Sequence, residues 1–204
     1  GEEYFQMLDA IIQLESAWTV SLGYESFKSF INDIAAAYLV KHHMMVDRNK
    51  LKRLDKFNEK RDCAPQPGEI SYWRAYADFL KTDKVFSLLR RLDSDDRIGK
   101  VERRNHRGIN LTEWFGVVSQ VRQATVHNSA VIKKAKIEEW SQHKKQDILY
   151  RIFPGTYGEN GYILQLTREH ANNALKMFAE YAFVIYRSLS NIYGYEWKMV
   201  VEGA

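Results

Sequence analysis

Cysteine, proline and glycine are scarce in this chain, and each shortage excludes a class of structure. The single cysteine, Cys63, cannot form an internal disulfide and has no second cysteine with which to build a zinc site. Three prolines and eleven glycines among 204 residues leave long stretches without a helix breaker. The sequence therefore predicts an all-α protein in a reducing compartment, and we expect the cytoplasm.

Long apolar runs are also missing. No run approaches the roughly 20 residues that a membrane-spanning helix needs, and the N-terminus has no basic-then-apolar signal peptide. Gly1 in place of an initiator methionine suggests a tag remnant, which leaves open what precedes Glu2 in the natural chain. Hydrophobic residues make up 45% and charged residues 27%, as in a soluble chain with a sizeable core. We expect one domain over residues 1–204 and no membrane partner.

Helical periodicity covers the first 45 residues. Segment 2–22 carries apolar residues at helical spacing, and we expect a core helix that ends near Gly23. A second helix is expected over residues 24–45, so Gly23 either joins two antiparallel neighbours or lies in one bent helix. The stripe expected to face the core in the first segment consists of Met7, Ile11, Leu14 and Trp18.

The middle and end of the chain alternate between charged segments, breakers and helical patterns. Residues 47–61 indicate a short exposed helix, residues 63–68 a turn, and residues 69–92 one or two helices with a break near Thr82. Residues 133–153 are expected to be helical, and a short strand or hairpin is expected near residues 150–166. The cleanest pattern starts at Thr167 and ends before Gly194, and we expect it to be the longest helix. Its inward residues would be Ala171, Leu175, Phe178, Ala182, Ile185, Leu189 and Ile192, with Tyr181, Phe183 and Tyr186 widening the apolar face.

The chain carries a small excess of positive charge. A net charge of +4 favours an anionic partner only weakly. Residues 93–110 have few apolar residues and no sustained periodicity, so they indicate a long loop, and cations gather in its second half. We interpret these cations as an RNA-phosphate contact surface, with a solvated loop as the alternative. They are Lys100, Arg103, Arg104 and Arg107.

The stretch from Thr112 to Ile132 combines an apolar helix face with two residues suited to phosphate chemistry. Trp114, Phe115, Val118 and Val121 keep the spacing of one buried stripe, and Thr112 is the expected N-cap. On the same helix, Arg122 supplies a permanent cation and His127 an imidazole that can exchange a proton near neutral pH.

The pattern R-x-x-x-x-H followed by asparagine, late in an amphipathic helix, resembles the signature of the HEPN superfamily. It is carried here by Arg122, His127 and Asn128, while Gln123 stands where the family usually has Asn, Asp or His. The resemblance implies an up-and-down helical bundle. It also implies a metal-independent endoribonuclease of toxin or antiphage type, in which the ribose 2′-hydroxyl attacks the adjacent phosphate.

In that reading Arg122 and His127 are catalytic, with Gln123 and Asn128 in support. His127 would assist proton transfer and Arg122 would stabilise the extra negative charge of the transition state. The alternative is a catalytically inactive HEPN-like module that binds a nucleotide or a protein, and Gln123 favours this alternative. An antitoxin protein is a possible further partner. His42 and His43 are adjacent and lack further ligands, so we predict no metal site, and no cofactor.

Helix geometry predicts a homodimer. Five residues separate Arg122 from His127 by about 140° around the helix and about 7.5 Å along it, so one helix does not easily aim both at one phosphate. In a two-fold dimer, Arg122 of one chain can approach His127 of the other. We therefore expect two motifs to line a shared cleft, flanked by residues 100–107.

Overall fold

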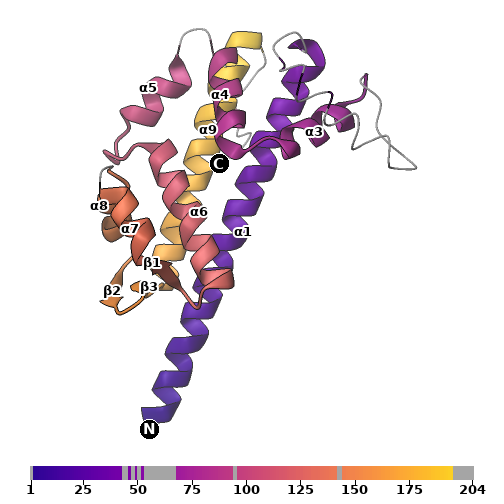
Figure 1. Cartoon of the computed structure of the whole chain (residues 1–204). Coiled ribbons are helices and arrows are strands. Elements are labelled where there is room, and N and C mark those ends of the chain that lie inside the picture. Colours follow the sequence, from indigo (N-terminus) through magenta and orange to yellow (C-terminus); the bar gives the residue numbers. More distant parts are fainter. Residues whose placement is uncertain are drawn as a thin grey trace, which may run out of the picture. The chain divides into compact units, whose positions relative to one another are not determined.

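The computed structural model describes residues 2–42, 46, 49, 52, 68–93, 96–141 and 144–194 (Figure 1). The charged segment 47–61, the turn at 63–68 and His43 lie almost entirely outside these residues. The helices are α1 (Glu2–His42), α3 (Ile70–Phe79), α4 (Thr82–Leu92), α5 (Arg97–Arg103), α6 (Leu111–His127), α7 (Lys134–Ser141), α8 (Lys145–Ile152) and α9 (Arg168–Tyr193). The strands are β1 (Val131–Lys133), β2 (Gly155–Gly158) and β3 (Gly161–Leu164). The predictions of a helical protein and of a short hairpin near residues 150–166 are confirmed.

Contacts between residues divide the chain into two compact units. The first, here called the motif unit, comprises Gly1–Ser26 and Arg97–Arg187, and the second comprises Phe27–Asp96 and Ser188–Ala204. Helices α1 and α9 each contribute residues to both units. The prediction of one domain over residues 1–204 stays a prediction.

In the second unit, α3 and α4 supply aromatic and aliphatic core residues, and the chain breaks between them at Leu80 and Lys81 as expected. Arg74 of α3 joins α1 through an ion pair from Nε to Asp33 Oδ1 at 2.9 Å. Asn32 of α1 also donates from Nδ2 to Asp78 Oδ1 at 2.7 Å. These polar contacts fix the register of α3 along α1.

Helix α1 runs without interruption through Gly23, so the chain forms one helix where two antiparallel helices were the other possibility. A Cβ atom on Gly23 would lie 2.7 Å from Leu175 Cδ2 and 3.0 Å from Phe178 Cδ2. Both side chains belong to α9, so glycine at this position permits close packing of two helices. The glycine therefore marks a helix contact and not a turn.

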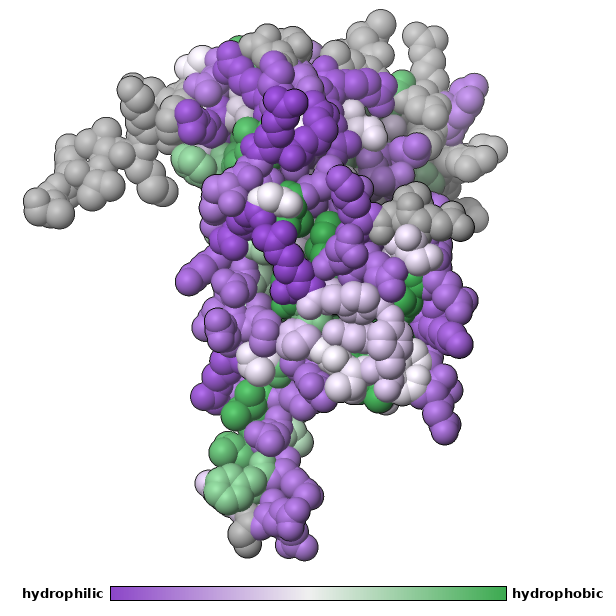
Figure 2. Space-filling model, turned by 90° about the vertical axis from the view of Figure 1, so that its left-hand side faces the viewer, coloured by the Kyte–Doolittle hydropathy of each residue, from purple (hydrophilic) through white to green (hydrophobic). Residues whose placement is uncertain are grey.

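The apolar stripe in the first half of α1 is exposed, so the prediction that residues 2–22 form a core helix was wrong. Met7, Leu14 and Trp18 keep 56%, 55% and 65% of their surface exposed. Figure 1 shows the first turns of α1 extending past the small sheet of the motif unit, and Figure 2 shows apolar surface on the extended part. Periodicity identified the apolar face correctly, but no described element of the motif unit covers it.

Residues 93–110 were predicted as a loop and instead contain α5. Ile98, Gly99 and Glu102 are buried on this helix. Seven residues make fewer than two helical turns, which is too short for hydrophobic periodicity to show in the sequence.

Helix α6 begins at Leu111, with Asn110 as its N-cap in place of the predicted Thr112. The Oδ1 atom of Asn110 accepts hydrogen bonds from the backbone N–H groups of Thr112 and Glu113, at 3.0 and 3.1 Å. The predicted apolar stripe of this helix is buried and confirmed. It consists of Trp114, Phe115, Val118 and Val121.

Helix α6, here called the motif helix, ends at His127, because the chain reverses at Ser129 and Ala130 and then forms β1. Strand β3 pairs antiparallel with both β1 and β2, giving the order β1-β3-β2. The helix predicted over residues 133–153 is accordingly two shorter helices, α7 and α8. The sheet thus closes over the end of the motif helix.

Helix α9 ends before Gly194 as predicted, but at 26 residues it is shorter than the 41 residues of α1. Tyr181 is buried, whereas Leu175, Phe183 and Tyr186 are exposed, so the buried face is narrower than expected. The sequence pattern could not distinguish apolar residues inside this face from those at its edge.

Candidate functional site

Arg122 lies on the side of α6 that faces α1. Its Nη2 atom forms an ion pair with Oε1 of Glu25 at 2.9 Å, and its Nε atom is buried without a hydrogen-bond partner among the described residues. Two contacts hold α1 against α6 here: Tyr24 stacks on Phe115 at 4.9 Å between ring centroids, and its hydroxyl donates to Ser119. The guanidinium is half-buried, and a carboxylate already neutralises part of its charge.

His127 is exposed and is the last residue of α6. At about 100° per residue, its direction lies about 140° from that of Arg122 and only about 40° from that of Gln123. The contacts agree with this geometry, since Arg122 meets α1 whereas Gln123 lines a hollow elsewhere on α6. Within one chain, the two proposed catalytic side chains therefore lie on different faces of the helix.

The turn after His127 uses an uncommon backbone conformation. Ser129 and Ala130 have φ values of 50° and 63°, in the left-handed region that residues other than glycine seldom adopt. The backbone N–H of Ala130 donates to Ala124 O at 3.0 Å, and the carbonyl of Ala130 accepts from Leu164 N–H at 2.9 Å. These bonds tie the end of the motif helix to β3, and the sequence contains no glycine that would have indicated the turn.

A hollow of about 420 Å³ lies beside the motif, between α6, β1 and α7. Its polar lining consists of Gln120, Gln123, Asn128, Lys133, Lys136 and Glu139. Its apolar lining consists of Ala124, Val131, Ile132 and Ala135. The structure therefore brings the two predicted supporting residues, Gln123 and Asn128, to one site. Sequence reasoning missed Gln120, although Gln120, Gln123 and His127 follow the three-and-four spacing of one helix face.

The cations predicted to contact RNA lie near the opposite end of α6. Lys100 and Arg103 are exposed on α5, and Arg104 is exposed directly after it. The 16 residue steps from Leu111 to His127 correspond to about 24 Å along the helix axis. The expectation that these cations flank the motif is therefore not met within a single chain.

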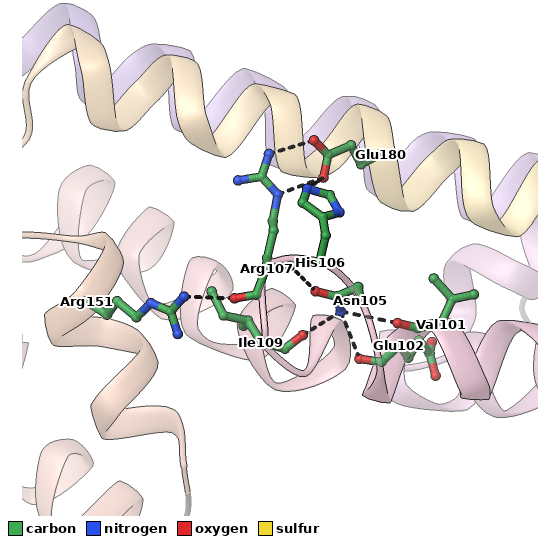
Figure 3. A network of polar contacts seen from close by, with 8 residues as sticks. All are labelled: Val101, Glu102, Asn105, His106, Arg107, Ile109, Arg151 and Glu180. Atoms are coloured by element: carbon green, nitrogen blue, oxygen red, sulfur yellow. Dashed lines mark hydrogen bonds and ion pairs between the residues drawn. The ribbon is translucent and has the colours of Figure 1, made fainter.

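The guanidinium of Arg107 is engaged by a carboxylate of α9 (Figure 3). Its Nε and Nη2 atoms donate to both carboxylate oxygens of Glu180 on α9, at 2.7 and 2.6 Å. Arg151 of α8 donates to the backbone carbonyl of Arg107 at 2.8 Å. The hydrogen bond from Arg107 lowers the pKa of Glu180, and the same bond raises the pKa of Arg107. Arg107 therefore connects the turn that contains it to helices α8 and α9.

A buried carboxyl also supports the start of the motif helix. Glu102 of α5 is buried and accepts a hydrogen bond from the hydroxyl of Tyr181 on α9. That hydroxyl also lies 3.4 Å from Oγ1 of Thr112, in the first turn of α6. Thr112, predicted as a cap, thus stands beside a polar contact between α5 and α9.

Among the described residues, no three His, Cys, Asp or Glu side chains are grouped so that they could hold a metal ion. Within the same part of the chain, no helix has the length and apolar character needed to cross a membrane. No protein-family model, curated protein or solved structure matches this chain.

Proposed function

We propose that this protein is a metal-independent endoribonuclease of toxin or antiphage type, with Arg122 and His127 as its catalytic residues. The observation that carries the proposal is the position of both side chains in the last two turns of α6, with His127 on the helix face of Gln123, which lines a hollow large enough for a ligand. His127 is exposed to an incoming strand, and Arg122 is held in place by Glu25.

The proposed reaction is an internal transfer at the phosphate. The ribose 2′-oxygen forms a bond to phosphorus and the bond to the 5′-oxygen breaks, leaving a 2′,3′-cyclic phosphate and a 5′-hydroxyl. His127 accepts the proton of the 2′-hydroxyl, and the leaving 5′-oxygen takes a proton from water. Arg122 stabilises the additional negative charge on the phosphorane-like transition state, for which it must exchange Glu25 for phosphate.

A homodimer is part of this proposal, because Arg122 and His127 of one chain point about 140° apart. The exposed stripe of α1 supports it. Met7, Leu14 and Trp18 share a helix face with Glu25, the partner of Arg122, so Arg122 lies in line with the stripe. Association of two copies through this stripe would bring Arg122 to the boundary between them.

The alternative function is a catalytically inactive HEPN-like module that binds a nucleotide or a partner protein such as an antitoxin. The ion pair between Arg122 and Glu25 favours this alternative, because a guanidinium paired at 2.9 Å already serves to hold two helices together. Gln123, which lines the hollow, would then serve binding alone.

The decisive experiment is cleavage of single-stranded RNA in excess EDTA, followed by analysis of the product ends. We expect cyclic phosphate ends and a loss of at least about a hundredfold in rate for His127→Ala, the usual contribution of a general acid or base. His170→Ala is the matched control, since His170 lies on α9 and its Nδ1 atom contacts Thr167 at 2.6 Å. Cleavage that needs a metal, or an unchanged rate for His127→Ala, would refute the mechanism.

A further inference from the structure

We propose that the hollow between α6, β1 and α7 is a subsite for an unpaired nucleobase, with adenine as the matched base. This inference rests on the proposed ribonuclease function, because it assigns the hollow to the nucleotide beside the scissile phosphate. The hollow and the proposed proton-transfer residue share one face of α6. His127 follows Gln123 by four residues and Gln120 by seven, so their directions differ by about 40° and about 20°.

Three of the six polar residues that line the hollow carry carboxamides. Gln120 and Gln123 project from α6, and Asn128 lies at its C-terminal cap. Each carboxamide offers a donor and an acceptor side by side, which matches the paired acceptor and donor on an edge of adenine. A phosphate alone would not need acceptors, so this chemistry fits a base better than a bare anion.

Four lining residues are apolar and suit the face of a flat ring. Ala124, Val131, Ile132 and Ala135 supply this surface, and Ile132 is buried. The volume of about 420 Å³ lies within the range of small-ligand pockets, about 300 to 1,000 Å³. Single-stranded RNA is generally read through bases that are splayed out into such sites.

Charge at the rim is positive on one side only. Lys133 is exposed on β1, whereas Nζ of Lys136 bonds both carboxylate oxygens of Glu139 at 2.8 and 2.7 Å. The Lys136 and Glu139 charges therefore offset one another, and Lys133 remains to contact a phosphate. This arrangement places a base in the hollow and its backbone on the side of β1.

Binding of oligonucleotides that cannot be cleaved tests the subsite independently of catalysis. Four labelled homopolymers with 2′-O-methyl riboses lack the attacking hydroxyl, and fluorescence anisotropy gives the affinity of each. We expect the full chain to bind the adenine polymer more tightly than the other three, by on the order of tenfold. This is the discrimination that a bidentate base contact provides. Combined replacement of Gln120, Gln123 and Asn128 by alanine should remove this preference while preserving binding to the backbone.

Two further variants make the result specific. Ala135→Trp should fill the hollow from an exposed position, at little cost to folding, and should also remove the base preference. Gln13→Ala combined with Gln165→Ala removes two exposed amides elsewhere and should leave the preference intact. Equal affinity for all four polymers, no binding of any polymer, or a preference unchanged in the hollow variants would overturn the subsite.

Cleavage of unmodified RNA, measured in parallel, separates the two proposals. Cleavage without a base preference in binding would leave the ribonuclease in place and remove the subsite. A base preference that depends on the hollow, in a chain that does not cleave, would retain the binding site and remove the catalytic role of His127.

Discussion

Ser129 and Ala130 form a turn with a left-handed backbone, and at the scale of single residues this turn decides where the motif helix stops. Both have positive φ values, 50° and 63°. A left-handed conformation costs a residue with a Cβ atom roughly 1–2 kcal/mol. The hydrogen bonds of Ala130 to Ala124 and Leu164 offset this cost by fastening the turn to α6 and β3.

Replacing Ala130 by glycine should therefore stabilise the protein. Relief of strain outweighs the greater flexibility of unfolded glycine, and we expect a gain of about 0.5 to 1 kcal/mol in the free energy of unfolding. Chemical denaturation measures the change. Ala17→Gly, in the interior of α1, is the control and should lower stability by about 1 kcal/mol. A loss of stability in Ala130→Gly would contradict the strained turn.

The ion pair of Glu180 predicts how the stability of the protein changes at acidic pH. Its pKa is lowered mainly by the hydrogen bond from Arg107, so it contributes stability that is present above its unfolded pKa and is lost as pH falls through the folded pKa. The window therefore lies below the ordinary glutamate pKa of 4.5. Glu180→Gln should reduce stability at pH 7 and flatten the decline on acidification below pH 4.5, as followed by denaturation at each pH.

The control for this prediction is Glu138→Gln, which removes one carboxyl from an exposed position on α7. It should leave both the stability at pH 7 and the acid decline close to those of the unchanged chain. Parallel curves for Glu180→Gln and the unchanged chain would argue against the contribution of the Arg107 pair.

At the scale of elements, the first half of α1 has an apolar face that no described element of the motif unit covers. Every charged residue before Phe27 is acidic, and the apolar stripe lies between these carboxylates. Monomeric proteins rarely leave contiguous apolar patches of more than a few hundred Å² exposed. The stripe is the surface through which we expect two copies to associate.

The double variant Ile11→Lys with Trp18→Lys should shift the protein from dimer to monomer, because it places two charges on the apolar stripe. Sedimentation velocity at several concentrations measures the change. Gln6→Lys with Gln13→Lys alters the net charge equally on another face of α1 and should leave the dimer unchanged. The same sedimentation coefficient for both double variants would exclude this stripe as the contact.

At the scale of the whole molecule, the separation of Arg122 from His127 on one helix requires either a second chain or a large movement. A mixed dimer of Arg122→Ala and His127→Ala chains distinguishes these possibilities. If the site combines Arg122 of one chain with His127 of the other, each mixed dimer contains one intact site, and we expect about half of the unaltered activity per dimer. The matched measurement is each variant alone, which should be inactive.

A mixed dimer without activity would rule out a site shared between chains. Full activity in a protein that sediments as a monomer at assay concentration would remove the dimer from the proposal altogether.

The sequence by itself determined the helices that are long and strongly periodic. The buried stripe of α6 and the extent of α9 could both be predicted, because apolar spacing over many turns indicates one continuous buried face. Arg122, His127, Gln123 and Asn128 were grouped only by their resemblance to the HEPN signature, whereas helical spacing gave the relative directions of Arg122 and His127. Short elements such as α5 and β1 could not be predicted, because seven or three residues are too few to show a periodic pattern.

Only the tertiary structure decided what each face meets. The stripe of α1 reads like the stripe of α6, yet Trp18 is 65% exposed and Trp114 is fully buried. The pairing of Arg122 with Glu25 and of Arg107 with Glu180 joins residues 97 and 73 positions apart, a separation that no local spacing can encode. Periodicity records which side of a helix is apolar, whereas burial and ion pairing depend on which distant segment the fold brings against that side.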